Sequence, residues 1–109
     1  MYIRRDSAVK IFLDDQRPCP KGLGYECARN FKMCKLWIAI CKGKLEFVDL
    51  DYSIGDNATG LDVLSYLKEK KVIVEHINLH STNIEGEHAM RRFAEANFPD
   101  AIITSHKYD

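Results

Sequence analysis

Apolar positions along the chain fall into two kinds of block. Short continuous apolar runs are typical of buried strands, and apolar residues spaced three and four apart are typical of helices. The pattern predicts strands over 9–13, 25–29, 45–51, 72–79 and 101–104, and helices over 31–42, 61–70 and 86–98. Glu75 and His76 interrupt the fourth strand, whose buried part is expected at 76–79. Strands that alternate with helices predict an α/β fold with a parallel sheet and right-handed crossovers.

Glycines and prolines mark the ends of these elements. The stretch RPCPKGLG after the first strand reads as a loop, Gly43 is placed to end the first helix, and Pro99 stops the last one. Gly60 precedes the second helix, where it allows close packing or a turn of the backbone.

Length and composition narrow the classes of protein. The chain has 109 residues, of which 46% are apolar, and this fits a single domain over 1–109. Sixteen basic and sixteen acidic residues give zero net charge, which disfavours nucleic-acid binding through a bulk positive field. No stretch approaches the ~20 apolar residues of a membrane span, and the start lacks the apolar core of a secretion signal. A cytoplasmic protein without membrane contact is expected.

The four cysteines are Cys19, Cys27, Cys34 and Cys41. Their spacing matches no C-x-x-C metal knuckle or redox pair, so free thiols are expected. Cys34 and Cys41 lie in the first predicted helix, where they are expected to behave as small buried apolar residues.

Three carboxylates follow the ends of predicted strands. Asp14 and Asp15 come directly after the first strand, and Asp51 ends the third. Ligands of parallel sheets gather at the carboxyl ends of the strands, and converging carboxylates are costly unless a hard cation neutralises them. The sequence therefore predicts an Mg²⁺ or Mn²⁺ site. Asp49 lies two residues before Asp51, so it is expected on the same side but deeper in the sheet.

Arg17 follows the acidic pair on a loop that starts at the sheet edge. Its guanidinium could fork onto a phosphate group. A salt bridge to Asp14 or Asp15 is an equally weighted alternative.

His80 ends the fourth strand at the same edge. Imidazole is suited to proton transfer near neutral pH, so His80 is a candidate catalytic residue; a hydrogen-bonded histidine at a strand end is the alternative. His76 lies lower in the strand and His88 within a helix, and both are expected to be structural.

A hydroxyl, an amide and a glycine follow His80. Ser81 and Asn83 precede Gly86, which is expected to open the third helix. Free amides at a helix N-terminus bind anions, so these three residues are candidates for phosphate binding.

The arrangement resembles the receiver domain of two-component response regulators. By that resemblance, Asp14 and Asp15 match the metal-binding acidic pair, Asp51 matches the phospho-acceptor, and Ser81 matches the hydroxyl residue that contacts the phosphoryl group. Receivers carry a lysine at the end of the fifth strand and a helix after it. This chain offers Lys107, a few residues late, followed by Tyr108.

A closer resemblance is to a derived receiver-like family named for cyclic-phosphate processing. The pattern of that family is LDD-x-R-x-P, then LD-x-x-(L/I)G with a following G-x-D, then HS-x-N-x-x-G. The corresponding stretches here read LDDQRPCP, LDYSIGDNATGLD and HSTNIEG. The resemblance spans roughly 11–90, and Tyr52 departs from an expected histidine. It implies a flavodoxin-like three-layer sandwich around a mostly parallel five-stranded sheet, with the first and last helices reduced or missing.

The resemblance also implies an activity. A metal-dependent cyclic phosphodiesterase, a hydrolase, is expected to act on a small cyclic phosphate or nucleotide, or on a nucleic-acid end. Asp14, Asp15 and Asp51 would bind the cation. Arg17 and the Ser81, Asn83 and Gly86 cluster would stabilise developing charge, and His80 would protonate the leaving oxygen. One alternative is a receiver-like signalling or interaction module that is phosphorylated on Asp51 or is degenerate and only binds a ligand. Another is a non-catalytic nucleotide or cyclic-nucleotide sensor that uses the same edge.

Overall fold

A parallel five-stranded sheet organises the computed structural model, which describes residues 9–55 and 57–107. Its order is β2-β1-β4-β6-β7, and every neighbouring pair is parallel. This confirms the flavodoxin-like, receiver-like class. The elements are β1 (Lys10–Leu13), β2 (Glu26–Ala28), α1 (Phe31–Ile40), β3 (Lys44–Leu45), β4 (Phe47–Leu50), α2 (Gly60–Glu69), β5 (Ile73–Val74), β6 (His76–Leu79), α3 (Ile84–Asn97) and β7 (Ile102–Thr104).

Two of the expected strands are each divided by one residue. β3 and β5 form a separate two-stranded sheet, and the chain then continues into β4 and β6. The breaks fall at Glu46 and Glu75, whose amides donate to the carbonyl oxygens of Val9 and Leu45 respectively. The break at Glu75 agrees with the sequence pattern, whereas that at Glu46 was not expected.

Side-chain caps set the helix starts. Asn30 caps α1 and Asn83 caps α3, each by accepting a hydrogen bond from an amide three residues on. Thr59 and Asp62 form a reciprocal capping box at the start of α2. Because Asn83 is a cap, α3 begins at Ile84, two residues before the expected start.

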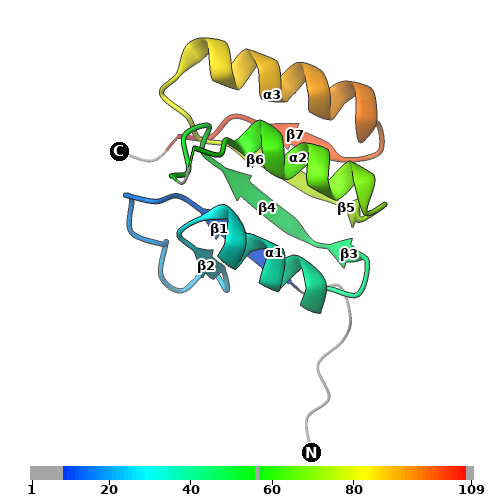
Figure 1. Ribbon diagram of the computed structural model, residues 1–109, viewed down its shortest axis with the longest axis horizontal. Coiled ribbons are helices and arrows are strands. Elements are labelled where there is room, and N and C mark those ends of the chain that lie inside the picture. The colour runs from blue at the N-terminus through cyan, green and yellow to red at the C-terminus, as the bar shows by residue number, and fades with distance from the viewer. Residues whose placement is uncertain (1–8, 56, 108–109) are drawn as a thin grey trace, which may run out of the picture.

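The three helices lie together on one face of the sheet (Figure 1). Each crossover from β2, β4 and β6 moves across the sheet in the same direction, and right-handed crossovers in one direction place their helices on one side. In the described part of the chain the opposite face carries no helix. The described part of the fold is therefore asymmetric, with three helices on one face of the sheet and none on the other.

The strands divide their side chains between these two faces. The core on the helical side contains paired apolar residues from β1, β4 and β6, namely Ile11, Leu13, Val48, Leu50, Ile77 and Leu79. Residues between them point to the other face. There, Phe12, Asp49, Asn78 and Thr104 form one row across four neighbouring strands. Polar groups thus run through the sheet on the side without helices.

The cysteines differ from expectation. Cys19, in the loop after β1, forms a disulfide with Cys27 on β2, so the prediction of four free thiols is wrong for this pair. Parallel pairing places Cys27 beside Phe12, and the loop folds back over the sheet edge. Cys34 and Cys41 are free and buried, as expected. No helix among the described residues has both the length and the apolar character needed to cross a bilayer.

Candidate functional site

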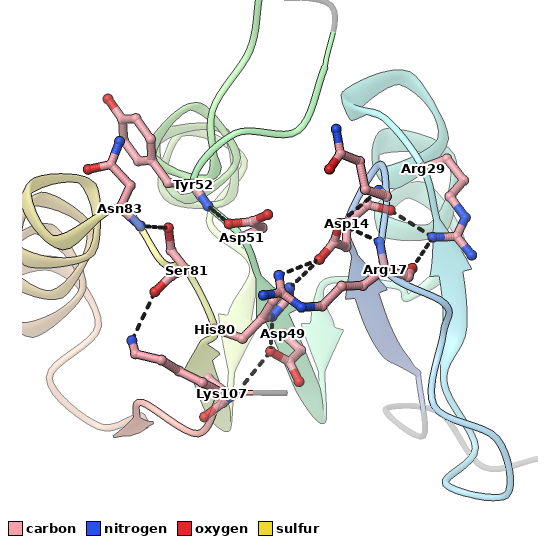
Figure 2. Close-up of polar contacts among 12 residues, drawn as sticks. Asp14, Arg17, Arg29, Asp49, Asp51, Tyr52, His80, Ser81, Asn83 and Lys107 are labelled. Atoms are coloured by element: carbon pink, nitrogen blue, oxygen red, sulfur yellow. Dashed lines mark hydrogen bonds and ion pairs between the residues drawn. The ribbon is translucent and has the colours of Figure 1, made fainter. Parts of the chain in front are cut away.

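A polar cavity of about 410 Å³ opens at the carboxyl ends of β1, β4 and β6. Parallel strands bring their loops together at this edge. The loops after β1, β4 and β6 supply the lining residues, as Figure 2 shows for several of them. The lining residues are Asp14, Asp15, Gln16, Arg17, Asp51, Ser53, Ser81, Thr82 and Asn83.

Asp14 is held from several directions. One carboxylate oxygen accepts hydrogen bonds from the amides of Gln16 (2.8 Å) and Arg17 (3.0 Å), and the other lies 3.0 Å from Nε2 of His80. Burial acts to raise the pKa of Asp14, but the two amides and His80 outweigh it, so the pKa lies below its ordinary value. The carboxylate is therefore ionised and fixed in direction.

Asp51 follows β4 and faces the same cavity. Burial raises the pKa of Asp51 above its ordinary value. The hydrogen bond from the Tyr52 amide (2.7 Å) and one from Ser81 oppose this shift, whereas the charge of Asp14 adds to it. Ionisation of Asp51 beside the Asp14 carboxylate is thus disfavoured, and a bound cation would favour that ionisation.

The donor set fits a divalent cation. Among the described residues, a carboxylate oxygen of Asp14, one of Asp51 and a ring nitrogen of His80 lie within 4.8 Å of one another. Because both His80 nitrogens already lie against carboxylates, Asp14 and Asp51 are the two residues that could hold a cation. Two carboxylates with room for water and phosphate oxygens suit Mg²⁺ or Mn²⁺. Asp15 lines the cavity but is not in this group. It is exposed, and its carboxylate lies beside Gly55 in the loop after β4.

Arg17 lies at the cavity with its guanidinium on Asp14, at 3.3 Å. The salt-bridge alternative is therefore present in this structure. The loop that carries Arg17 is held by Arg29, whose guanidinium donates to the backbone oxygens of Asp14 and Arg17. Arg29 was not identified from the sequence. Its place at the end of β2, beside β1, becomes apparent only when the strand order is known.

His80 is buried, with none of its surface exposed, and does not line the cavity. Its Nδ1 lies 2.6 Å from Asp49 and its Nε2 3.0 Å from Asp14. Its ring is stacked on Phe12, with centroids 4.9 Å apart. We therefore correct the expectation that His80 donates a proton directly to a substrate, because both ring nitrogens are engaged within the protein. The alternative of a hydrogen-bonded histidine at a strand end describes it.

The expected anion cradle is only partly formed. Ser81 and Asn83 line the cavity. The Ser81 hydroxyl accepts a hydrogen bond from the backbone N–H of Asn83. The amide of Gly86 donates instead to the Asn83 side chain (2.8 Å), and a Cβ at position 86 would lie 2.4 Å from the Tyr52 ring. Gly86 is thus a packing residue, and its assignment to phosphate binding is corrected.

Lys107 reaches the site more closely than its late position suggested. Its ammonium group donates to the backbone oxygen of Ser81 (2.9 Å) and pairs with Glu87. Figure 2 shows its side chain pointing to Ser81. Of the remaining lining residues, Gln16, Ser53 and Thr82 carried no distinguishing signal in the sequence beyond their neighbours.

Comparison with known protein families identifies a match over most of the chain. The family model for the cyclic-phosphate processing receiver domain matches residues 9–96. No curated protein and no solved structure matches the chain.

Proposed function

Because the chain belongs to the cyclic-phosphate processing receiver domain family, we propose that it hydrolyses a cyclic phosphate on a nucleotide or a nucleic-acid end with Mg²⁺ or Mn²⁺. The observation that carries this proposal is the convergence of Asp14 and Asp51 on one polar cavity beside Arg17.

In this proposal Asp14 and Asp51 hold the cation, with Asp15 at the rim. A bound divalent cation would polarise the phosphate and lower the pKa of a water molecule. In the reaction, a water oxygen forms a bond to phosphorus and one ring P–O bond breaks. The leaving oxygen takes a proton from solvent, and the product is a phosphomonoester.

Arg17 is the residue proposed to stabilise negative charge on the substrate. Its guanidinium lies on Asp14, and a bound cation would compete for that carboxylate and release Arg17 toward the phosphate. Ser81 and Asn83 would position the phosphate from the opposite side of the cavity.

The proposal is tested by ³¹P NMR. Purified protein with Mg²⁺ or Mn²⁺ is mixed with 2′,3′- and 3′,5′-cyclic nucleotides and with ADP-ribose 1″,2″-cyclic phosphate. Asp51→Asn should abolish ring opening while the fold persists by circular dichroism. Asp100→Asn, the same change at an exposed residue outside the cavity, is the matched control and should retain full activity. Equal turnover by Asp51→Asn and the unmodified protein would contradict the proposal.

The contact of Lys107 with Ser81 favours a second candidate, a receiver-like module phosphorylated on Asp51. An aspartate, a hydroxyl residue and a lysine lie at one sheet edge here, as the receiver pattern requires. Incubation with a small phosphodonor, followed by intact mass measurement, separates the two. A stable phosphoryl adduct that is absent in Asp51→Asn, without ring opening, would favour the module.

A further inference from the structure

Asp49 is a carboxylate buried beneath the candidate cation site. It lies on β4, and none of its surface is exposed. One of its oxygens lies 2.6 Å from Nδ1 of His80 and accepts a hydrogen bond from the side-chain amide of Asn78 at 2.9 Å. The other oxygen accepts a hydrogen bond from the Tyr25 hydroxyl at 3.4 Å. A buried carboxylate is costly to desolvate, so its presence here calls for a compensating role.

His80 connects Asp49 to the site. One ring nitrogen contacts Asp49 and the other contacts Asp14. The His80 ring stacks on Phe12 with an interplanar angle of 3°, and this stacking fixes the plane of the His80 ring. Each nitrogen of the ring thus lies against a different carboxylate, so the ring joins Asp49 to Asp14. Figure 2 shows the resulting series Asp49, His80, Asp14.

We infer that Asp49 is a positioning residue of this site: acting through His80, it fixes the direction of the Asp14 carboxylate and so raises the affinity for a divalent cation. Groups that orient a metal ligand typically contribute 10–100-fold to metal affinity. This inference rests on the proposed function, because it takes Asp14 to be a cation ligand.

The decisive experiment measures Mn²⁺ affinity by calorimetry without any substrate. Asp49→Asn should weaken Mn²⁺ binding about 10–100-fold. Tyr25→Phe is the matched control, because it removes a different hydrogen bond to Asp49 and leaves the contact with His80 in place; its Mn²⁺ affinity should be unchanged. An unchanged affinity in Asp49→Asn would overturn the inference.

A double variant distinguishes action through His80 from a general structural effect. His80→Gln should weaken Mn²⁺ binding to a similar extent, and adding Asp49→Asn to it should cause no further loss. Additive losses would overturn the inference, because Asp49 would then act independently of His80. If Asp49→Asn does not fold, His80→Gln alone still tests whether the series supports Asp14.

A metal-free measurement keeps this inference separable from the proposed function. In ¹⁵N spectra of the histidine rings, Asp49→Asn should shift the signal of Nε2, which faces Asp14, as well as that of Nδ1. A shift confined to Nδ1 would overturn the positioning role. Mn²⁺ binding without ring opening would contradict the proposed hydrolysis and leave the inference standing. Failure of the unmodified protein to bind Mn²⁺ would overturn both.

Discussion

Gly60 lies so close to Asp51 that a Cβ atom at position 60 would be 2.4 Å from the carbonyl oxygen of Asp51. The same atom would be 2.6 Å from the sulfur of Met90. The first turn of α2 is thus packed directly on the segment that carries the candidate cation ligand. Close packing was expected of Gly60 from the sequence, and the structure identifies what it packs against.

Gly60→Ala should therefore destabilise the fold, although alanine favours helices. Overpacking typically costs about 1–3 kcal/mol, against a helix-propensity gain of about 1 kcal/mol. Urea denaturation measures the difference. Ser65→Ala, an exposed position on the same helix, should be neutral or slightly stabilising. A Gly60→Ala variant as stable as Ser65→Ala would show that the backbone of Asp51 can move away.

Gly86 and Tyr52 should be energetically coupled. Gly86→Ala places a methyl group against the Tyr52 ring, and we expect a loss of about 1–3 kcal/mol. In a Tyr52→Ala background the ring is absent, so the same change should cost much less. A double-mutant cycle from denaturant unfolding gives the coupling. Strictly additive losses would mean that the cost arises elsewhere.

The ion pair of Lys107 and Glu87 should make stability depend on acid pH. Partial burial acts to raise the pKa of Glu87, but hydrogen bonds from Lys107 and Ser105 and the charges of Lys107 and Arg91 hold it below its ordinary value. The stabilisation is fully present above the unfolded pKa of ~4.3 and is lost as pH falls through the folded pKa. Because Lys107 is 44% exposed, its contribution should be about 1 kcal/mol or less.

Glu87→Gln tests this dependence. The difference in unfolding free energy between the unmodified protein and Glu87→Gln should be largest near neutral pH and should shrink toward pH ~3. Glu95→Gln, on the same helix but 58% exposed, is the control. A difference that stays constant over this range would argue against the ion pair.

Reduction of the Cys19–Cys27 disulfide should lower stability. The bond closes a short loop with a sequence separation of 8, for which chain entropy gives about 2–3 kcal/mol. Unfolding with and without a phosphine reductant measures the effect, and Cys19→Ser should remove the dependence on reductant. Cys34 and Cys41 are both buried, and burial raises the pKa of Cys34 to about 12, so alkylation of the native protein should label only the reduced pair. Labelling without reductant would show that the bond does not form.

The sequence predicts the order of elements well because apolar periodicity is local. Strand ends could be read from Leu13 and Leu50, and the parallel arrangement then brings Asp14 and Asp51 to one edge. The break at Glu46 could not be predicted, since it depends on a backbone bond to Val9 across the sheet.

Other features depend on contacts between segments that are distant in the sequence. The burial of His80 follows from Phe12 and Asp49, which flank it from two other strands. No spacing in the sequence reports such contacts. The same holds for Cys19 and Cys27, which approach each other only because β2 pairs with β1. The capping role of Asn83 was readable in principle, because Asn followed three residues later by a helical amide is a common cap.

All described helices lie on one face of the sheet (Figure 1), so alternate residues of the same strands have different packing partners. The side chains of Ile11, Val48 and Ile77 pack toward the helices. The residue that follows each of them belongs to the row on the opposite face, and these residues are Phe12, Asp49 and Asn78. A substitution in the apolar core therefore changes contacts on one face of the sheet, and a substitution in the row changes contacts on the other face. Residues that pack the core and residues beneath the candidate cation site therefore occupy alternate positions of the same strands, so each set can be substituted without replacing the other.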